Sequence, residues 1–338
     1  MNESALNNFT RRRFLSATTA LGATSLLGWP ELSQAESPPE VNKIRLVHTP
    51  AICLSPQYLA EEFLHMEGFS EVEYVLSGDV LAANIVAAGK ADFTQDGVSS
   101  LLPLLDAGSP IVVLSGVHAG CYELFAHDDV KTITDLRGKR IAIPGIGSNA
   151  HMLMASMLAY VGIDPRKQVT WVTGAKYDDS VPFMNRDADA IMAFAPLPQQ
   201  LREKKIGRVI LNTTFDRPWS QYFCCVVLGQ REFVSKYPIA TKRALRAFLK
   251  ATDVCEREPE RAARMLVEKG YESRYDIALE VLKELPYQRW REASAEDTLR
   301  FHALRLHEVG MIKTSPNKLV ARGSDWRFLN ELKKELKA

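Results

Sequence analysis

Residues 140–173 read RIAIPGIGSNAHMLMASMLAYVGIDPRKQVTWVT. The first four residues are a short, largely apolar strand, residues 151–161 are an apolar helical run, and residues 169–172 are a second strand. A helix enclosed by two short strands is typical of a parallel βαβ unit. The stretch therefore predicts an α/β fold.

The same alternation extends outward in both directions. Predicted strands and helices alternate at 44–48, 55–66, 72–76, 79–88, 92–93, 97–105 and 111–114, and further strands follow at 190–193 and 209–211. In two places an acidic residue, Asp92 or Asp189, opens an apolar strand that is followed by a proline, a helical run and a glycine. This repetition favours two related halves, with coincidence between similar βα units as the alternative.

The last third of the chain is predicted to be helical. Pro238 and Pro259 stand at the first turn of two predicted helices, at 238–250 and 259–269, where proline is favoured. Further helices are expected at 275–285, 295–309 and 325–337.

Residues 1–35 have the features of an export signal. Three arginines at 11–13 precede a mildly apolar stretch at 17–29, and Ser33 and Ala35 are the small residues of a cleavage site. This order predicts a secretory signal that is cleaved after Ala35, and the doubled arginine indicates the Tat route. A membrane anchor is the alternative, but so short a stretch cannot cross about 30 Å of hydrocarbon.

The charge balance excludes a nucleic-acid-binding surface. The 338 residues include 42 basic and 41 acidic side chains, and 46% are hydrophobic, as in ordinary folded proteins. Removal of the signal takes away three arginines and two glutamates, which leaves 39 basic and 39 acidic side chains. A neutral body has no basic field for nucleic acid or anionic membranes, so neither is an expected partner.

The segment GIGSNAH at 145–151 imitates the dinucleotide fingerprint, with Gly-x-Gly-x-x-Ala between a strand and a helix. That fingerprint also needs an acidic residue at the end of the next strand, but here the strand ends in WVTG and the nearest acids are at 178–179. Pro144 in the turn is a second departure. We expect Ser148 or Asn149 to cap the helix, whose free N–H groups hold a polar or anionic group; a cap without a ligand is the alternative.

The cysteines and histidines do not form a recognised metal signature. Cys224 and Cys225 are neighbours in a predicted strand, so they are expected to face opposite sides as small buried residues rather than to form a bridge. Five residues near predicted strand ends would resemble a metal site if they converged: His48, Cys53, His118, Cys121 and His151. Nothing in their spacing requires this, so the sequence favours separate loop and core residues and assigns no metal and no cofactor.

Catalytic signatures are also missing from the sequence. Serine occurs in no Gly-x-Ser-x-Gly context, which excludes a nucleophile elbow. His302 and His307 are five residues apart and would face different directions on a helix.

Several segments, in this order along the chain, resemble one family. They are AAGKADF at 87–93, DLRGKRIA at 135–142, GIGSNAH with GID at 162–164, DAI at 189–191, and YP at 237–238 with ALRAF at 244–248. Together they resemble the periplasmic solute-binding proteins of ABC importers, in the family that takes up nitrate, sulfonates, taurine and thiamine-pyrimidine precursors. The resemblance covers about residues 43–270.

The resemblance implies a type II periplasmic-binding-protein fold with two doubly wound α/β lobes joined by two hinge strands, near 123–127 and 223–228. After the signal peptide at 1–35, one lobe would comprise residues 36–123 and 226–338, and the other residues 124–225. The lobes would close over a ligand, and a membrane permease would recognise the closed form. The protein would then be a binding protein and not an enzyme.

Ligands of doubly wound lobes lie beyond the carboxyl ends of the strands. This rule selects the loops 49–57, 95–99, 116–122 and 145–151, together with two aromatic positions. The expected ligand-binding residues are Pro50, Ser55, Gln57, Asp96, Gly97, Gly116, His118, Ser148, Asn149, His151, Phe194 and Trp219.

These four loops contain no Lys or Arg, and Lys176 and Arg217 are the nearby cation candidates. An oxyanion would depend on helix N-termini and histidine, which favours a neutral or aromatic heterocyclic solute over nitrate or sulfonate without excluding them. The expected partners are a small-molecule ligand, an inner-membrane ABC permease and, during export, the Tat translocase, with the protein a monomer in the periplasm. The alternatives are a Tat-exported cofactor-binding oxidoreductase, a pyrimidine-synthesis enzyme of the same fold, and a sensor lobe.

Overall fold

The computed structural model describes residues 36–49, 51–78, 80–174 and 178–337. The predicted export signal and the predicted ligand contact Pro50 lie outside the described residues. The chain from Pro38 onward forms one compact unit that contains two five-stranded sheets. None of the helices in the described part combines the length and apolarity that a membrane crossing needs.

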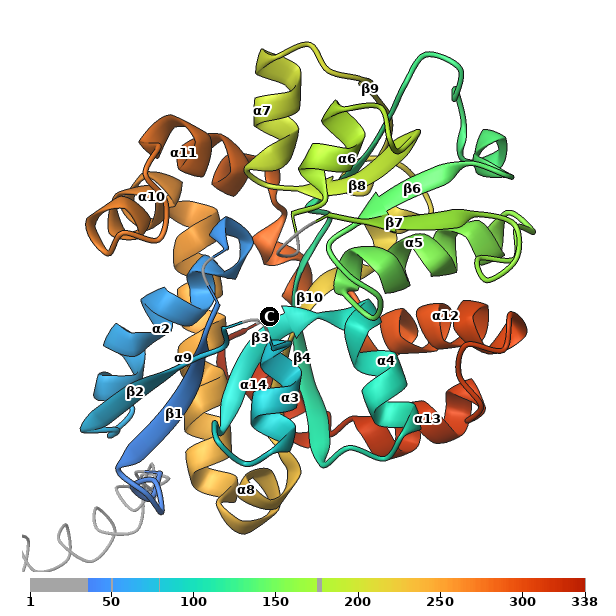
Figure 1. Cartoon of the computed structure of the whole chain (residues 1–338). Coiled ribbons are helices and arrows are strands. Elements are labelled where there is room, and N and C mark those ends of the chain that lie inside the picture. The colour runs from blue at the N-terminus through green and yellow to red at the C-terminus, as the bar shows by residue number, and fades with distance from the viewer. Residues whose placement is uncertain (1–35, 50, 79, 175–177, 338) are drawn as a thin grey trace, which may run out of the picture. The chain divides into compact units, whose positions relative to one another are not determined.

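The first sheet has the strand order β2-β1-β3-β10-β4 (Figure 1). Its strands are β1 Lys43–His48, β2 Glu71–Leu76, β3 Phe93–Gly97, β4 Ile111–Ala119 and β10 Phe223–Gln230. β1 is parallel to β2 and β3, whereas β10 is antiparallel to β3 and β4. Because β10 runs against both of its neighbours, the carboxyl ends of β1, β2, β3 and β4 meet at one edge of the sheet.

The second sheet has the order β7-β6-β8-β5-β9. Its strands are β5 Tyr122–Ala126, β6 Arg140–Ile143, β7 Thr170–Thr173, β8 Ala190–Phe194 and β9 Arg208–Asn212. β6 pairs in parallel with β7 and β8, and β5 is antiparallel to β8 and β9. The βαβ unit predicted from residues 140–173 is therefore confirmed as β6, the following helix and β7.

Helices and short 3-10 turns connect these strands. Before β10 they are η1 Ile52–Leu54, α2 Ser55–Met66, α3 Ala82–Ala87, α4 Val98–Asp106, η2 Ile133–Leu136, α5 Asn149–Tyr160, α6 Ser180–Met184, α7 Leu197–Glu203 and η4 Trp219–Gln221. After β10 they are α8 Arg231–Lys236, α9 Pro238–Arg257, α10 Pro259–Glu268, α11 Tyr275–Glu284, η5 Tyr287–Arg291, α12 Ala295–Glu308, α13 Pro316–Gly323 and α14 Arg327–Glu335. The predicted helical C-terminal third, with prolines opening α9 and α10, is confirmed.

The two sheets repeat one ion pair. In the first sheet, the backbone N–H and guanidinium of Arg45 both donate to the Asp92 carboxylate, at 2.7 and 2.6 Å. In the second, Arg140 makes the same two contacts with Asp189, at 2.8 and 2.9 Å. Asp92 and Asp189, which precede similar segments in the sequence, therefore occupy equivalent places in the two sheets. This equivalence supports two related halves.

The chain passes between the sheets at two links. One is residues 120–121, between β4 and β5, and the other is residues 213–222, between β9 and β10. The strands expected at the crossings are present as β5 and β10, each of them paired within its own sheet. Hydrogen bonds tie the second link to the first and to the start of β5, because the Cys121 N–H donates to Thr214 Oγ1 at 3.3 Å and the Thr213 N–H donates to the Tyr122 carbonyl at 2.9 Å.

Candidate functional site

The carboxyl ends of β1, β3 and β4 carry buried polar atoms that no other described residue satisfies. Thr49 follows β1, Gln95 lies in β3, Ser99 is the second residue of α4, which follows β3, and His118 lies near the end of β4. Thr49 Oγ1, both amide atoms of Gln95, Ser99 Oγ and His118 Nε2 have no hydrogen-bond partner among the described residues. Buried polar groups normally have partners, so this edge of the first sheet is the candidate binding site.

Thr49, Gln95 and Ser99 were not among the residues predicted individually, although all three lie in the predicted loops. Sequence alone gave no reason to prefer them to their neighbours. Gln95 and Ser99 are almost completely inaccessible to solvent. The signal that singles them out is the missing hydrogen-bond partner, which only the packed structure reveals.

The predicted contacts Ser55 and Gln57 make their hydrogen bonds within the chain. Ser55 Oγ donates to the Ile52 carbonyl at 2.5 Å. The Gln57 amide donates to the Val47 carbonyl at 2.6 Å and accepts from the Gln95 N–H at 2.7 Å. Both side chains are fully buried, so they support the loop after β1 and hold Gln95 in place.

Asp96 and Gly97 end β3, where Asp96 holds the start of α3 and Gly97 lies beside the start of α4. The Asp96 carboxylate accepts from the N–H groups of Ala83, at 3.0 Å, and Gly97, at 2.7 Å. Burial raises the pKa of Asp96 to about 6 despite these bonds. Gly97 leaves room for the side chain of Asn149, with which a Cβ atom would collide.

Three of the predicted residues organise the N-terminus of α5. Ser148 Oγ caps the helix by accepting from the His151 N–H at 3.2 Å, as predicted. Asn149 instead reaches α4, where its Oδ1 accepts from the N–H groups of Ser99 and Ser100. His151 Nδ1 accepts from the Gly147 N–H at 3.0 Å, and burial lowers the pKa of its imidazole to about 4, so this ring is neutral at pH 7.

The predicted aromatic residues lie apart from one another. Phe194 is exposed, with its ring 5.5 Å from that of Tyr122. Trp219 is buried, with its ring 5.3 Å from that of Tyr160. Gly116, another predicted position, lies against the Phe223 ring with no space for a Cβ atom.

A small cavity lies between the links, α5 and α12. It has a volume of about 20 Å³, and its walls include Gly120, Leu153, Trp219, Cys224 and His302. A cavity needs about 10–15 Å³ of accessible volume to hold one water molecule, so this one has room for little more than a single water. A solute therefore needs the segments around this cavity to move apart.

Four residues with metal-ligating side chains converge beside this cavity. Cys53, His118, Cys121 and Cys225 place one ligand atom each within 4.8 Å of one another. The expectation of separate loop and core residues is therefore wrong for Cys53, His118 and Cys121, and it did not include Cys225. The other two histidines lie elsewhere: the His48 ring is 5.2 Å from that of Tyr271, and the His151 ring is 4.6 Å from that of Trp171.

Cys224 lies next to this group. Its Sγ is 2.9 Å from Cys121 Sγ and 3.9 Å from Cys225 Sγ, and all three cysteines are free thiols. The prediction that Cys224 and Cys225 are buried is confirmed. The prediction that they face opposite sides is wrong, because the pairing register of β10 with β4 shifts on both sides of Cys225, and such bulges re-aim side chains.

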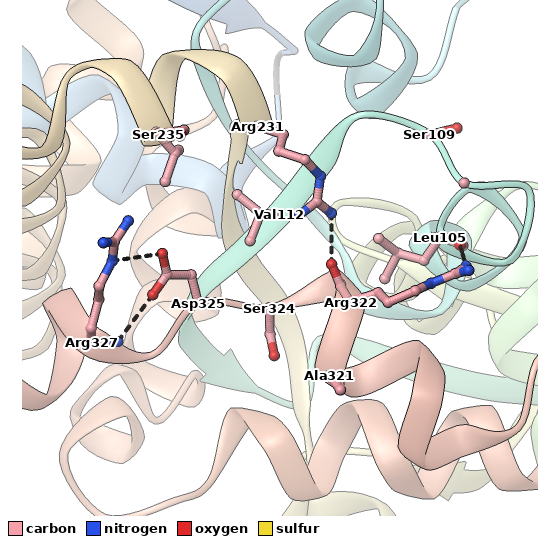
Figure 2. Close-up of a pocket in the computed structure, with 13 residues that line it drawn as sticks. Leu105, Ser109, Val112, Arg231, Ser235, Ala321, Arg322, Ser324, Asp325 and Arg327 are labelled. Carbon is pink, nitrogen blue, oxygen red and sulfur yellow. Dashed lines mark hydrogen bonds and ion pairs between the residues drawn. The ribbon is translucent and has the colours of Figure 1, made fainter.

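A larger hollow lies elsewhere on the first sheet, at the amino end of β4. It has a volume of about 630 Å³, and Figure 2 shows that its charged side chains already have partners. Arg231 donates to the Arg322 carbonyl at 2.6 Å, and Arg327 pairs with Asp325 at 2.9 Å. This hollow is at the wrong end of the strand for the ligand site of a doubly wound sheet.

Residues 56–262 match the model of the family described as NMT1/THI5 like. No curated protein matches the chain significantly.

Several solved structures share the fold. The periplasmic nitrate-binding protein NrtA from Synechocystis PCC 6803 aligns with a TM-score of 0.74 and 14% identity, over 89% of this chain and 90% of that one. The alkanesulfonate-binding protein SsuA from Xanthomonas axonopodis pv. citri, bound to MOPS, has a TM-score of 0.68 and 18% identity over 85% and 99%. The desulfurization enzyme DSZB has a TM-score of 0.58 and 14% identity over 88% and 100%.

At these identities the structural matches show the fold alone. It is the two-lobed α/β fold of periplasmic binding proteins, and this confirms the predicted fold class. The family match is stronger evidence of kinship, because it spans more than half of the sequence and includes all of the segments that carried the resemblance. The protein belongs to the NMT1/THI5-like family.

Proposed function

We propose that this protein is the periplasmic solute-binding component of an ABC importer and that it closes over a small polar solute. The observation that carries the proposal is the set of buried polar atoms at the carboxyl ends of β1, β3 and β4 that find no partner within residues 36–49, 51–78, 80–174 and 178–337. Leaving such groups unpaired costs about 1–3 kcal/mol each. A solute that supplies the missing hydrogen bonds removes this cost.

The hydrogen-bonding groups indicate the chemistry of the solute. The Gln95 amide both donates and accepts, and Thr49 and Ser99 contribute hydroxyl groups. The loops around them contain no Lys or Arg. A neutral heterocycle or amide fits this set better than nitrate or a sulfonate, whose charge would depend on the N-terminus of α5.

The mechanism follows from the position of Asn149. Its hydrogen bonds to α4 connect a helix of the second sheet to one of the first, and the adjacent cavity is smaller than a solute. Solute entry requires these bonds to break, and closure forms them again. In this proposal, the first sheet with its helices forms one lobe and the second sheet with its helices the other, so the divisions expected at 123–124 and 225–226 move to the links at 120–121 and 213–222. A permease in the inner membrane recognises the closed form after Tat-type export.

A thermal-shift screen tests the proposal. The purified protein is mixed with nitrate, alkanesulfonates, taurine, substituted pyrimidines and aromatic carboxylates, and any hit is confirmed by calorimetry. A true ligand at about 100 times its Kd stabilises the fold by about 2.7 kcal/mol, and pyrimidine-like compounds should give the largest increase in melting temperature. The proposal fails if no compound in the panel raises the melting temperature.

An enzyme is the second candidate function, because the desulfurization enzyme DSZB shares this fold and the family is described as NMT1/THI5 like. Each stabilising compound should therefore be incubated with the protein and analysed by mass spectrometry. Recovery of the unchanged compound supports a binding protein, whereas conversion to a product would establish an enzyme instead.

A further inference from the structure

We propose that Cys53, His118, Cys121 and Cys225 bind a thiophilic d10 metal ion, Zn²⁺ or Cu⁺. Their four ligand atoms lie within 4.8 Å of one another. A tetrahedral zinc site with Zn–S bonds of about 2.3 Å has sulfur atoms about 3.8 Å apart. The observed grouping therefore needs only a small contraction to surround one ion.

The donor set selects the class of metal. Three thiolates and one imidazole are the ligands of tetrahedral Cys₃His zinc sites. Soft thiolate ligands also suit Cu⁺, whereas hard cations such as Mg²⁺ and Ca²⁺ prefer oxygen. Zn²⁺ offsets more of the buried thiolate charge than Cu⁺ does, which favours zinc.

The His118 ring has the hydrogen bonding of a metal ligand. Its Nδ1 lies 3.1 Å from the Ala119 carbonyl, which can only accept, so the Nδ1–H donates this bond. This leaves Nε2 as the second ring nitrogen, buried and without a hydrogen-bond partner among the described residues. In a metal-binding histidine, one ring nitrogen usually donates to a backbone carbonyl or carboxylate, as Nδ1 does here, and the other binds the metal.

The fold brings the four residues together from separate places. Cys53 belongs to η1, and His118 and Cys225 are opposite one another on β4 and β10. Cys121 lies in the link between the sheets, with a positive φ of 75° that non-glycine residues seldom adopt. Such backbone strain is often found at functional sites. A metal here would fix the link to the first sheet and so stiffen one of the two links at which the sheets are connected.

Cys224 offers a competing chemistry. Its sulfur is 2.9 Å from that of Cys121, close enough for oxidation to a disulfide. This bond would remove Cys121 from the metal site. The same experiment must therefore count free thiols.

The test uses the full chain, purified under reducing and oxygen-free conditions and then stripped of metal with a chelator. Zn²⁺ and Cu⁺ are titrated separately against competing chelators, and Co²⁺ is added as a spectroscopic probe. We expect one Zn²⁺ per chain, and thiolate-to-cobalt charge-transfer bands with the intense visible bands of a tetrahedral site. Tighter binding of Cu⁺ in competition would identify copper as the ion.

Matched variants locate the site. Cys225→Ser and His118→Gln should each weaken metal binding by more than about a hundredfold, because loss of second-shell partners alone costs about 10–100-fold. Cys255→Ser is the control, since this thiol is equally buried but lies in α9, outside the group. Cys53→Ser serves as a further ligand variant if circular dichroism shows that Cys225→Ser does not fold.

Three results would overturn the proposal: no stoichiometric metal in the folded wild-type protein, a cobalt spectrum without thiolate bands, or a Cys121–Cys224 disulfide in protein isolated from the periplasm. The cobalt spectrum does not depend on any variant folding. The titrations contain no solute, so their outcome is independent of the proposed transport function.

Discussion

Asn149 Oδ1 accepts hydrogen bonds from the backbone N–H groups of Ser99 and Ser100, at 3.0 and 3.2 Å. A side chain from a helix of the second sheet therefore caps a helix of the first. Gly97 makes the approach possible, because a Cβ atom there would collide with the Asn149 amide. This relationship gives the two sheets a specific polar contact beside the candidate site.

Asn149→Ala should lower the free energy of unfolding by about 1 kcal/mol, since it removes the cap of α4. Gly97→Ala should also destabilise the protein by displacing the same side chain. Because the two changes affect one contact, the double variant should lose less than the sum of the two single variants in urea unfolding. Full additivity would show that Gly97 and Asn149 act independently.

Gln95→Leu should abolish the thermal shift given by the best solute while leaving the unliganded protein equally stable or more stable by about 1 kcal/mol. The reason is that the buried Gln95 amide has no hydrogen-bond partner in the described part of the chain, and replacing such a group with an apolar one of similar shape relieves its desolvation cost. Gln57→Leu is the matched control. Its amide makes three buried hydrogen bonds, so this change should cost more than about 2 kcal/mol. Equal destabilisation by both changes would contradict the assignment of Gln95 to the site.

His302 should make the protein less stable as the pH falls. Burial lowers the pKa of its imidazole to about 4 in the folded protein, against about 6.5 when unfolded. The unfolded state therefore binds the proton first, and stability that is fully present above pH 6.5 is lost as the pH falls toward 4. Between pH 7.5 and 5 this one group should account for about 2 kcal/mol.

His302→Gln should flatten the pH dependence by that amount, as measured by urea unfolding at several pH values. The comparison with wild type is needed because other groups also change the stability with pH. The lowered pKa of His151 makes the protein less stable as the pH falls, as that of His302 does, whereas Asp96 has the opposite effect. The raised pKa of Asp96, about 6, gives stability that is present at low pH and is lost as the pH rises through 6. An unchanged pH profile in His302→Gln would show that this imidazole does not titrate abnormally.

Glu67→Gln should destabilise the protein by about 3 kcal/mol. This carboxylate follows α2 and is nearly buried, and it pairs with Arg246 at 2.7 Å and Lys250 at 3.0 Å on α9. Removing its charge takes a buried carboxylate away from these partly buried cations, which is costly, although Arg246 keeps its pair with Glu335 at 3.0 Å. Glu71→Gln is the control, because Glu71 pairs with Lys43 at an exposed site, and its loss should cost less than about 1 kcal/mol. A similar cost for the two changes would mean that the α2–α9 contact depends on apolar packing alone.

The sequence by itself determined the fold class. Alternating strands and helices and the first-turn prolines at 238 and 259 are local features, and the structure has them as predicted. The acidic residues Asp92 and Asp189, predicted to open strands, lie one residue before β3 and β8. The helix cap Ser148 was also predictable, because a cap depends on residues three positions apart.

Only the tertiary structure decided how polar groups meet. Ser148 and Asn149 are neighbours in sequence, but one caps its own helix and the other caps a helix about 50 residues away. Cys53 and Cys225 converge because β1 and β10 belong to one sheet and because a bulge re-aims the side chain of Cys225. Local periodicity carries no information about such long-range pairing or about which buried amide, such as that of Gln95, is left without a partner. Those properties depend on the register and packing of segments that are distant in the chain.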